Sequence, residues 1–276
     1  MASVINTNIA SLNTQRNLST SQAGLATSMQ RLSSGLRINS SKDDAAGLAI
    51  ATAMDSQIRG QQVAIRNSND AISFAQTAEG SLAKQTDALQ RMRELAVQSA
   101  NGTNSADDRD NLDAEFSQLA EEITRLGTAT KFNGTAVFGT TDFTFQVGAG
   151  TVAVDDQITV TAVGAADSTA TAIAAGISGA DNTLALAAID EIDLQLKAVN
   201  TSRATLGAVQ NRFESVISNL QVSTENQSAA KSRIMDADFA AETANLSRGQ
   251  ILQQAGTAML AQANSLPNGV LALLRG

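Results

Sequence analysis

Residues 189–220 read IDEIDLQLKAVNTSRATLGAVQNRFESVISNL, and this stretch decides the fold. Its apolar residues fall at alternating intervals of three and four positions, which is the spacing of a coiled-coil seam. Only Arg203 and Gln210 interrupt the seam, and polar residues at such positions often fix the register of paired helices. The pattern predicts a helix over residues 184–226, roughly 65 Å long at ~1.5 Å per residue. A helix of that length needs partner helices. The seam consists of Ile189, Ile192, Leu196, Val199, Arg203, Leu206, Gln210, Phe213, Ile217 and Leu220.

Two further segments have the same helical spacing. Residues 44 to about 100 form the first, with Ile58, Ile65 and Ile72 at seven-residue intervals and an Asn-Gly-Thr-Asn cluster after the last turn. Residues 107–127 form the second, which opens on two aspartates, as helix starts often do. The predicted fold class is mainly α: a long antiparallel helical coiled-coil rod with a small β-hairpin region and paired N- and C-terminal helices.

Strand signals occur only in the middle of the chain. Apolar residues alternate with polar or small ones over 143–147, 152–154 and 158–160, and Gly148 and Gly150 mark a turn. We therefore expect a hairpin at about 137–162. Residues 163–183 are rich in Ala, Thr, Gly and Ser and predict a loop or weak helix.

The composition excludes several classes of chemistry. The 276 residues include no His and no Cys, so the commonest general base, thiol nucleophiles and disulfides are absent. A net charge of −8 disfavours nucleic acid as a partner. The beginning of the sequence does not resemble a cleavable secretory signal, and no apolar run approaches the ~18 residues needed to span a bilayer. We predict no enzyme, no cofactor, no metal site and no membrane insertion.

The two ends of the chain differ sharply from the rest in charge. Residues 1–41 contain only Arg16, Arg31 and Arg37 as charged groups, and residues 243–276 contain only Arg248 and Arg275. Both ends nevertheless carry apolar residues at helical spacing, so each predicts a helix that needs neighbours rather than water. We expect the two helices to pair in opposite directions and to leave surface for further pairs. The apolar positions are Ile5, Ile9, Leu12, Leu25, Met29, Leu32 and Leu36, and then Leu252, Met259, Ala263, Leu266, Val270 and Leu273.

The segment RLSSGLRINSSKDDAAGLAIA, residues 31–51, lies where the charge-poor N-terminal helix meets the charged rod. It lacks the GxxxxGK[ST] order of a phosphate-binding loop, and Lys42 beside two aspartates is typical of a solvated helix start. We therefore interpret Gly35 and Gly47 as parts of a joint between helices, not of a catalytic loop.

Several stretches together resemble one family, bacterial flagellin. They are INTNIASLNTQRNL, RLSSGLRINSSKDDAAGLAIA, LQRMRELAVQSANGT, KFNGT, LGAVQNRFESVISNL and SRIMDADFAAETANLSRGQILQQAGTAMLAQAN, and they lie in residues 1–140 and 184–276. The resemblance implies a subunit that is exported and polymerises outside the cell into the filament used for swimming. It implies that residues 1–41 plus 237–276 form the inner-tube domain, and that residues 42–236 form the rod domain with the hairpin at about 137–162 and a connector at about 163–183. Large outer domains would be absent.

The resemblance also implies partners. An export chaperone, the filament cap and the hook-junction proteins would contact the subunit. An animal cell-surface receptor would read Gln90, Arg91, Leu95 and Glu115, which would also serve as an assembly surface. Cytosolic immune sensors and the chaperone would read the C-terminal tail, which would pack the inner tube as well. The tail residues are Val270, Leu271, Leu273, Leu274 and Arg275. We expect Pro267 to end the continuous helix before this tail.

Two other functions remain open at this point. A hook–filament junction protein would share the terminal helices but form one short layer instead of a long filament. A coiled-coil stalk or signalling protein would form a stable soluble oligomer with ordered ends, whereas flagellin ends are expected to order only on assembly. An enzyme is a distant third.

Overall fold

The computed structural model describes residues 7–166 and 171–275, with side chains described for all of these except 171–172 and 266–275. The chain divides into two compact units, residues 1–56 with 225–276 and residues 57–224. Each unit is built mainly from helices that lie side by side.

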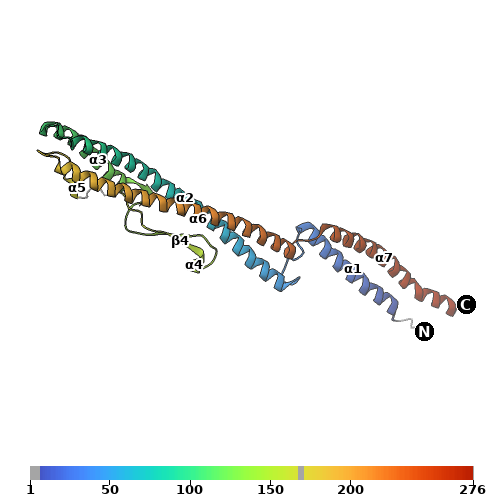
Figure 1. Ribbon diagram of the computed structural model, residues 1–276. Helices are drawn as coiled ribbons and strands as arrows, with labels where there is room; N and C mark the ends of the chain where they lie inside the picture. The colour runs from blue at the N-terminus through green and yellow to red at the C-terminus, as the bar shows by residue number, and fades with distance from the viewer. Residues whose placement is uncertain (1–6, 167–170, 276) are drawn as a thin grey trace. The chain divides into compact units, whose positions relative to one another are not determined.

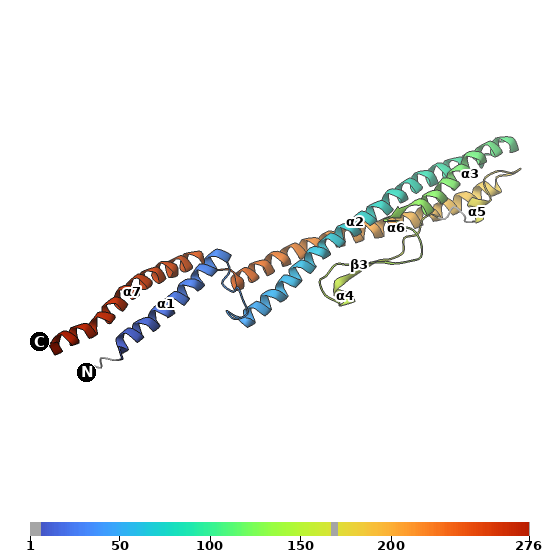
Figure 2. The same ribbon diagram turned by 180° about the vertical axis from the view of Figure 1, so that it is seen from behind.

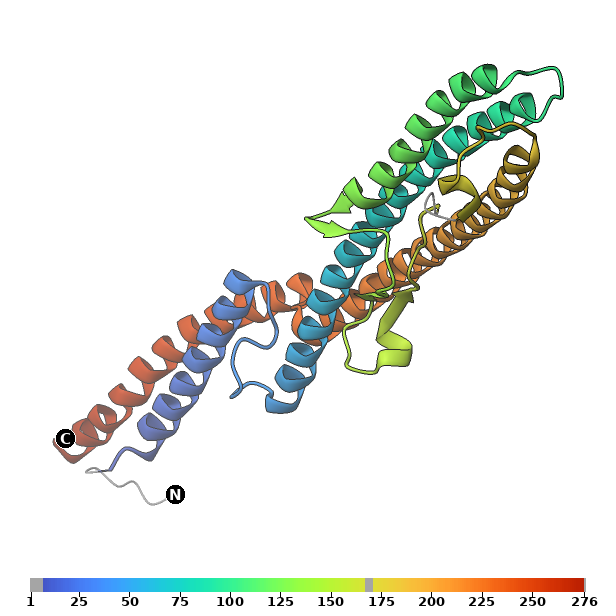
Figure 3. The same ribbon diagram turned by 90° about the vertical axis from the view of Figure 1, so that its left-hand side faces the viewer.

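Three long helices form the unit 57–224: α3 (Ala106–Ala129) and the larger parts of α2 (Ala45–Ser99) and α6 (Thr183–Met235). They run alongside one another (Figure 3). Each helix contributes buried residues at seven-residue intervals, as expected for coiled-coil packing. The buried rows are Ala71, Ala78, Gln85 and Met92 and then Ser68, Ala75, Leu82, Leu89 and Ala96 in α2; Arg109, Phe116 and Ile123 in α3; and Ile192, Val199, Leu206 and Phe213 in α6.

Side-chain contacts show that α2 and α6 are antiparallel. Arg93 donates to Asp193 at 2.7 Å near one end of the pair, and Gln61 donates to Ser223 at 3.0 Å further along. Between them, Glu79 of α2 accepts a hydrogen bond from Gln210 at 3.1 Å and lies 3.9 Å from Arg203. The two polar residues of the predicted seam therefore share one acidic partner, which fits only one register of the two helices.

The predicted helix boundaries agree closely for two of the three. The prediction of 44 to about 100 corresponds to α2, and that of 107–127 to α3, whose start carries a capping box between Ser105 and Asp108. In α6 the helix continues to Met235, beyond the predicted end at residue 226.

Two small antiparallel sheets follow α3. The first pairs β1 (Lys131–Phe132) with β2 (Thr135–Ala136), and the second pairs β3 (Phe143–Gln146) with β4 (Gln157–Val160). The β3–β4 register places Phe143 opposite Val160 and Gln146 opposite Gln157. The first sheet was not predicted. Its turn residues Asn133 and Gly134 have φ of 50° and 81°, and an Asn-Gly pair is the usual signal for such a turn.

The predicted strand at residues 152–154 is wrong. This part of the loop between β3 and β4 forms a short helix, α4 (Ala153–Asp156), because the Asp156 carboxylate accepts hydrogen bonds from the backbone N–H groups of Gly150 at 3.2 Å and Val152 at 3.0 Å. Those bonds curl the chain back on itself. Alternation of Val, Ala and Val therefore does not mark a sheet here, and Val154 is 87% exposed.

Aromatic side chains anchor the second sheet on the helices. The ring of Phe74 in α2 lies 4.6 Å from that of Phe143 and 5.8 Å from that of Phe145, measured between centroids. Phe145 in turn meets Phe213 of α6 edge-on at 5.8 Å. Such pairs add to the burial of the rings, so the sheet is part of the core and not an appendage.

The connector after β4 is also held firmly where the structure describes it. It contains one short helix, α5 (Thr171–Ala174), and buries Ile173 and Ile177. Arg109, 4% exposed, donates from Nε to the Ser99 carbonyl at 3.0 Å and from Nη1 to the Gly179 carbonyl at 3.3 Å. The low-complexity composition thus conceals a segment that is fixed to the ends of α2 and α3.

The other unit contains α1 (Ile9–Ser34) and α7 (Phe239–Arg275), with the start of α2 and the end of α6. The two helices, blue and red in Figures 1 and 2, lie side by side and run in opposite directions. The predicted pairing of the chain's two charge-poor ends is confirmed. None of the helices in the described parts of the chain is long and apolar enough to cross a membrane.

Candidate assembly surface

The residues through which α1 and α7 touch each other differ in size, because α1 contributes leucines and α7 contributes glycines. Along α1 the contacting row is Ser11, Leu18, Leu25 and Leu32, and along α7 it is Glu242, Gly249, Gly256 and Ala263, both at seven-residue intervals. A Cβ added to Gly249 would lie 3.1 Å from Leu25 Cδ1, and one added to Gly256 would lie 3.0 Å from Leu18 Cδ1. The leucines of α1 therefore sit directly over the glycines of α7, which lets the two backbones approach closely.

Most of the large apolar side chains on the pair point away from the partner helix. Ile9 is 67% exposed and Met259 is 62% exposed, although both were predicted to lie on apolar seams. The predicted seams are therefore split: Leu25 and Leu32 are half-buried and Ala263 is buried, whereas Ile9, Leu12, Met29, Leu252 and Met259 are exposed. We call the outward set the apolar stripe. It comprises Ile9, Leu12 and Met29 of α1 and Phe239, Ile251, Leu252 and Met259 of α7.

Charged groups are scarce around the stripe. In the described parts of α1 and α7, an ion pair joins Arg31 Nη1 to Glu242 Oε2 at 3.9 Å, at the end of the pair nearest the connecting loops. Glu242 is buried and belongs to the first turn of α7, where a negative charge is favoured. The other side chains that line the contact are apolar, small or uncharged, so water is a poor environment for this part of the chain.

The segments that join these helices to α6 and α2 are bonded to each other. Gly35, with φ of 71°, ends α1 in the left-handed conformation that glycine adopts readily. Its carbonyl accepts from Ala237 N at 2.9 Å, and Leu36 forms a β-bridge with Asp236. Arg37 donates from Nη2 to the Ile234 carbonyl at 2.6 Å. The predicted joint is thus a pair of loops fastened together, not a free hinge.

Gly47, the other glycine of the predicted joint, lies where the loop meets α2. It belongs to the first turn of α2, where its N–H donates to Asp44 Oδ1 at 2.8 Å. A Cβ at this position would lie 2.7 Å from Ile38 Cδ1, and Ile38 is buried. Gly47 therefore allows the loop to pack against the helix start, and it does not bend the chain.

Asp43 holds the same loop in shape. Its Oδ2 accepts from the backbone N–H groups of Ser40 at 2.9 Å and Asn39 at 3.1 Å. These bonds favour the ionised carboxylate, so the pKa of Asp43 is lowered below its ordinary value.

The residues expected to form a receptor surface are only partly brought together. Arg91 donates from Nε to Glu115 Oε1 at 2.8 Å and from Nη1 to Glu94 Oε2 at 3.0 Å, and Gln90 is exposed beside it. The carboxylates of Glu115 and Glu94 raise the pKa of Arg91. Leu95, however, is 1% exposed and belongs to the core of the rod. Leu95 therefore does not lie beside Gln90 and Arg91 on the surface of the subunit, and its part in a receptor surface stays a prediction.

The C-terminal tail continues as helix. The backbone of α7 extends to Arg275, so the expected break at Pro267 is wrong. The tail residues Val270, Leu271, Leu273, Leu274 and Arg275 lie in this helix, but their side chains are outside those that the structure describes.

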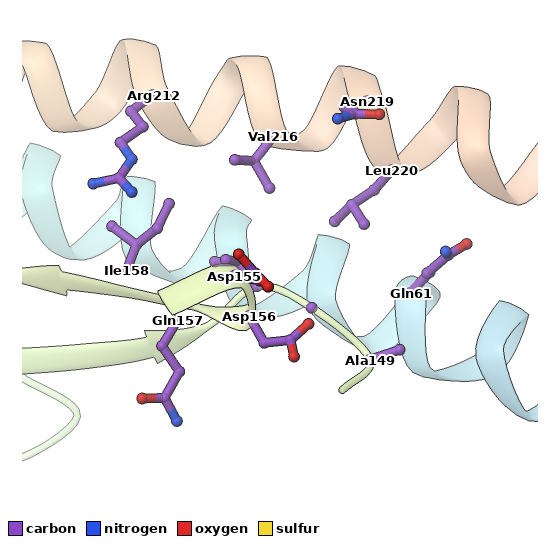
Figure 4. A pocket seen from close by; sticks show the side chains of 12 residues that line it. Gln61, Ala149, Asp155, Asp156, Gln157, Ile158, Arg212, Val216, Asn219 and Leu220 are labelled. Atoms are coloured by element: carbon purple, nitrogen blue, oxygen red, sulfur yellow. The ribbon is translucent and has the colours of Figure 1, made fainter. Parts of the chain in front are cut away.

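A hollow lies under the tip of the β3–β4 hairpin, between it and α6 (Figure 4). Asp155, Asp156 and Arg212 are among its lining residues, together with Val216 and Leu220. The carboxylate of Asp156 is already engaged by the N–H groups of its own loop. In the described ranges 7–166 and 171–275, no group of three or more acidic or other metal-binding side chains converges.

Comparison with known proteins identifies the family. The family model described as bacterial flagellin N-terminal helical region matches residues 5–142, and the one described as bacterial flagellin C-terminal helical region matches residues 189–274. The chain belongs to the bacterial flagellin family. A flagellin of Halalkalibacterium halodurans is 48% identical over 282 residues, covering 99% of this chain and 100% of the relative. The flagellin of Bacillus subtilis is 42% identical over 310 residues, covering 98% of this chain and 99% of the relative.

The two matched regions include all or most of each long helix of the fold. The N-terminal match covers α1, α2, α3 and the first small sheet, and the C-terminal match covers most of α6 and nearly all of α7. This flagellin is a structural subunit of the bacterial flagellar filament, which lies outside the cell and serves motility. The apolar stripe is the surface whose geometry bears most directly on that function.

Proposed function

We propose that this flagellin polymerises by burying the apolar stripe of its α1/α7 pair against the stripes of other copies around the filament axis. The supporting observation is that the stripe's large side chains remain exposed although α1 and α7 already cover one face of each other. A half-exposed Leu, Ile or Met side chain gains roughly 1 kcal/mol when it is buried completely. Seven such side chains supply a substantial driving force.

The geometry also supports an open lattice. Each subunit carries the stripe on one antiparallel helix pair. In a helical array of subunits every such pair has neighbours, except at the two ends of the array. Contacts that do not close on themselves give helical filaments. In this arrangement residues 1–41 plus 237–276 form the inner tube, and residues 42–236 form the surrounding rod domain.

The connector and hairpin support a filament without large outer projections. Residues 143–160 pack on α2 and α6 through the aromatic cluster, and the described connector residues are fixed by Arg109. The surface of the rod is therefore the proposed filament surface.

The same proposal includes export and partners. We infer that the subunit leaves the cell before its ends are paired with those of other copies, under an export chaperone that covers the C-terminal tail, and that it assembles beneath a cap onto hook-junction proteins. Host recognition would use Arg91, Glu115 and Gln90 on the rod, and a cytosolic sensor would read the tail. The chain acts through assembly and not as an enzyme.

Seeded polymerisation tests the proposal. Purified full-length chain added to short filament seeds should elongate them into long filaments visible by electron microscopy. A matched pair of variants lacking residues 1–41 or 243–276 should keep a folded rod, measured by circular dichroism, and should not elongate the seeds. A single short layer on the seeds would instead indicate a junction protein, and elongation by either truncated chain would refute the role of the stripe.

A further inference from the structure

One carbonyl in α7 has lost its normal partner. In a continuous α-helix the carbonyl of residue 263 accepts from the N–H of residue 267, four positions later. Residue 267 is proline, which has no N–H, yet α7 runs through this position. Ala263 is buried, and a buried carbonyl without a donor is strongly disfavoured. This position therefore requires a donor from outside the helix.

Asn8 supplies that donor from the other helix. Its Nδ2 donates to the Ala263 carbonyl at 2.7 Å. The other end of the same side chain is the N-cap of α1, where Oδ1 accepts from Ser11 N at 3.0 Å. One asparagine side chain thus satisfies a free N–H at the start of α1 and a free carbonyl within α7.

A second contact lies beside the first. Ser11 donates from Oγ to Asn264 Oδ1 at 2.7 Å, one residue after Ala263, and Ser11 is buried. Both bonds connect the first turn of α1 to the turn of α7 that precedes Pro267. At the opposite end of the pair the ion pair between Arg31 and Glu242 makes the corresponding link.

We propose that Asn8 is a positioning residue for assembly. It donates a hydrogen bond to the Ala263 carbonyl, which Pro267 leaves without an intrahelical donor, and it thereby sets the register of α1 against α7. This inference rests on the proposed function. Only one carbonyl in α7 is freed by a proline, because the chain contains a single Pro. If α1 shifts along α7 by one turn, the Asn8 amide faces a carbonyl that already accepts a hydrogen bond within α7. The Ala263 carbonyl then has no donor. The register of the pair then fixes which apolar residues lie together on the outward stripe.

Asparagine is the residue that meets both demands. Aspartate would keep the N-cap acceptor but would place a negative oxygen against a carbonyl oxygen. Serine would keep an N-cap but has no second group to reach α7. The inference therefore predicts that Asn8→Asp is much more harmful while residue 267 is proline than after Pro267→Ala.

The test is a set of variants in seeded polymerisation, read as the critical concentration for elongation by sedimentation. Asn8→Asp should raise it roughly tenfold, because the variant leaves a buried acceptor without a donor. Pro267→Ala restores an N–H to the Ala263 carbonyl, so the double variant Asn8→Asp/Pro267→Ala should return to within about twofold of Pro267→Ala alone. Asn17→Asp, which adds the same charge at an exposed position of α1, should have little effect.

A control separates this rescue from a general gain in helix stability. Leu18→Ala weakens the pair at Gly256, and Pro267→Ala should not relieve it beyond what it gives the wild type. Equal assembly of Asn8→Asp and wild type, or equal rescue of Asn8→Asp and Leu18→Ala, would overturn the inference.

Failure of the wild type to elongate seeds would count against the proposed function instead. Hydrogen exchange of residues 8–34 and 239–265 then decides the inference in the unassembled chain. Exchange should be faster in Asn8→Asp than in the wild type and should return in the double variant to the level of Pro267→Ala. Any other order of these variants overturns it.

Discussion

Replacing Gly249 by alanine tests whether close approach of α1 and α7 supports assembly. Alanine in place of glycine normally stabilises a helix by about 1 kcal/mol, because glycine loses more conformational freedom on folding. At Gly249 the added Cβ would lie 3.1 Å from Leu25 Cδ1, 3.4 Å from its Cβ and 3.7 Å from its Cα. The contacts with Cβ and Cα have ordinary van der Waals lengths, so the tight one is with Cδ1, and the Leu25 side chain must shift by a few tenths of an ångström where it covers the glycine.

The magnitude follows from two opposing terms. Overpacking by one methyl group costs about 2 kcal/mol in a tight contact, and the helix propensity of alanine offsets about 1 kcal/mol of this. The net loss of about 1 kcal/mol per subunit corresponds to a factor of about five in an equilibrium constant. We therefore expect Gly249→Ala to raise the critical concentration for polymerisation about fivefold.

Gly24 provides the matched control. It lies in α1, and an added Cβ would meet nothing within 4 Å. Gly24→Ala should therefore lower the critical concentration or leave it unchanged, since it keeps the propensity gain without the clash. Sedimentation of both variants over a concentration series gives the comparison. If Gly249→Ala polymerises as readily as Gly24→Ala, the leucine-over-glycine contact does not control the spacing of the helices.

Three further changes test the rod and the loop. Leu95→Ala should lower the free energy of unfolding by about 3 kcal/mol in urea titrations, because Leu95 is buried. Arg91→Ala, at a half-exposed position, should change it by less than about 1 kcal/mol. Equal effects of the two variants would refute the core placement of Leu95. Glu79→Gln should destabilise the rod by about 1 kcal/mol through Arg203 and Gln210, and the exposed Glu94→Gln, as control, should have a smaller effect. The pKa of Asp43 is lowered by its bonds to Ser40 and Asn39 from the ordinary value of 3.8. The carboxylate therefore stabilises the loop at pH values above 3.8, and this stabilisation is lost as the pH falls through the lowered pKa. The protection factor of the Ser40 amide, which compares its exchange rate with the intrinsic rate at the same pH, should fall across that acid range in the wild type, and a protection factor independent of pH would contradict the assignment.

The sequence predicts those features that depend on local signals. The start of α3 lies within one residue of its prediction, because Asp107 and Asp108 mark the first turn within the sequence itself. The paired ends were predicted from their low charge. In contrast, α6 continues beyond the predicted end because residues far away in the sequence satisfy its last carbonyls. Arg37 reaches the Ile234 carbonyl across 197 positions, and no local pattern contains that information.

The sequence does not distinguish a helix face that packs within the subunit from one that is left exposed. The family resemblance places Leu95 on a contact surface and periodicity places Ile9 on an apolar seam, but neither says how many neighbours that helix face has within the subunit. Leu95 is buried in α2, which contacts both α3 and α6, whereas Ile9 is exposed in α1, which among the described helices packs mainly on α7. The number of partners is a property of the assembled chain, so it appears only in the structure.

The two units specify register by different means, and the difference bears on assembly. In the rod, charged and polar side chains on the seam do so, with Glu79 between Arg203 and Gln210. The α1/α7 pair has few charges, so register depends on leucines over glycines and on the amide of Asn8. All of these register-setting residues lie between the helices of their own unit. The outward stripe consists of apolar side chains, which favour burial without favouring one alignment. A subunit built in this way arrives with its internal register fixed, while its contacts with other copies are chosen by shape and by the area they bury.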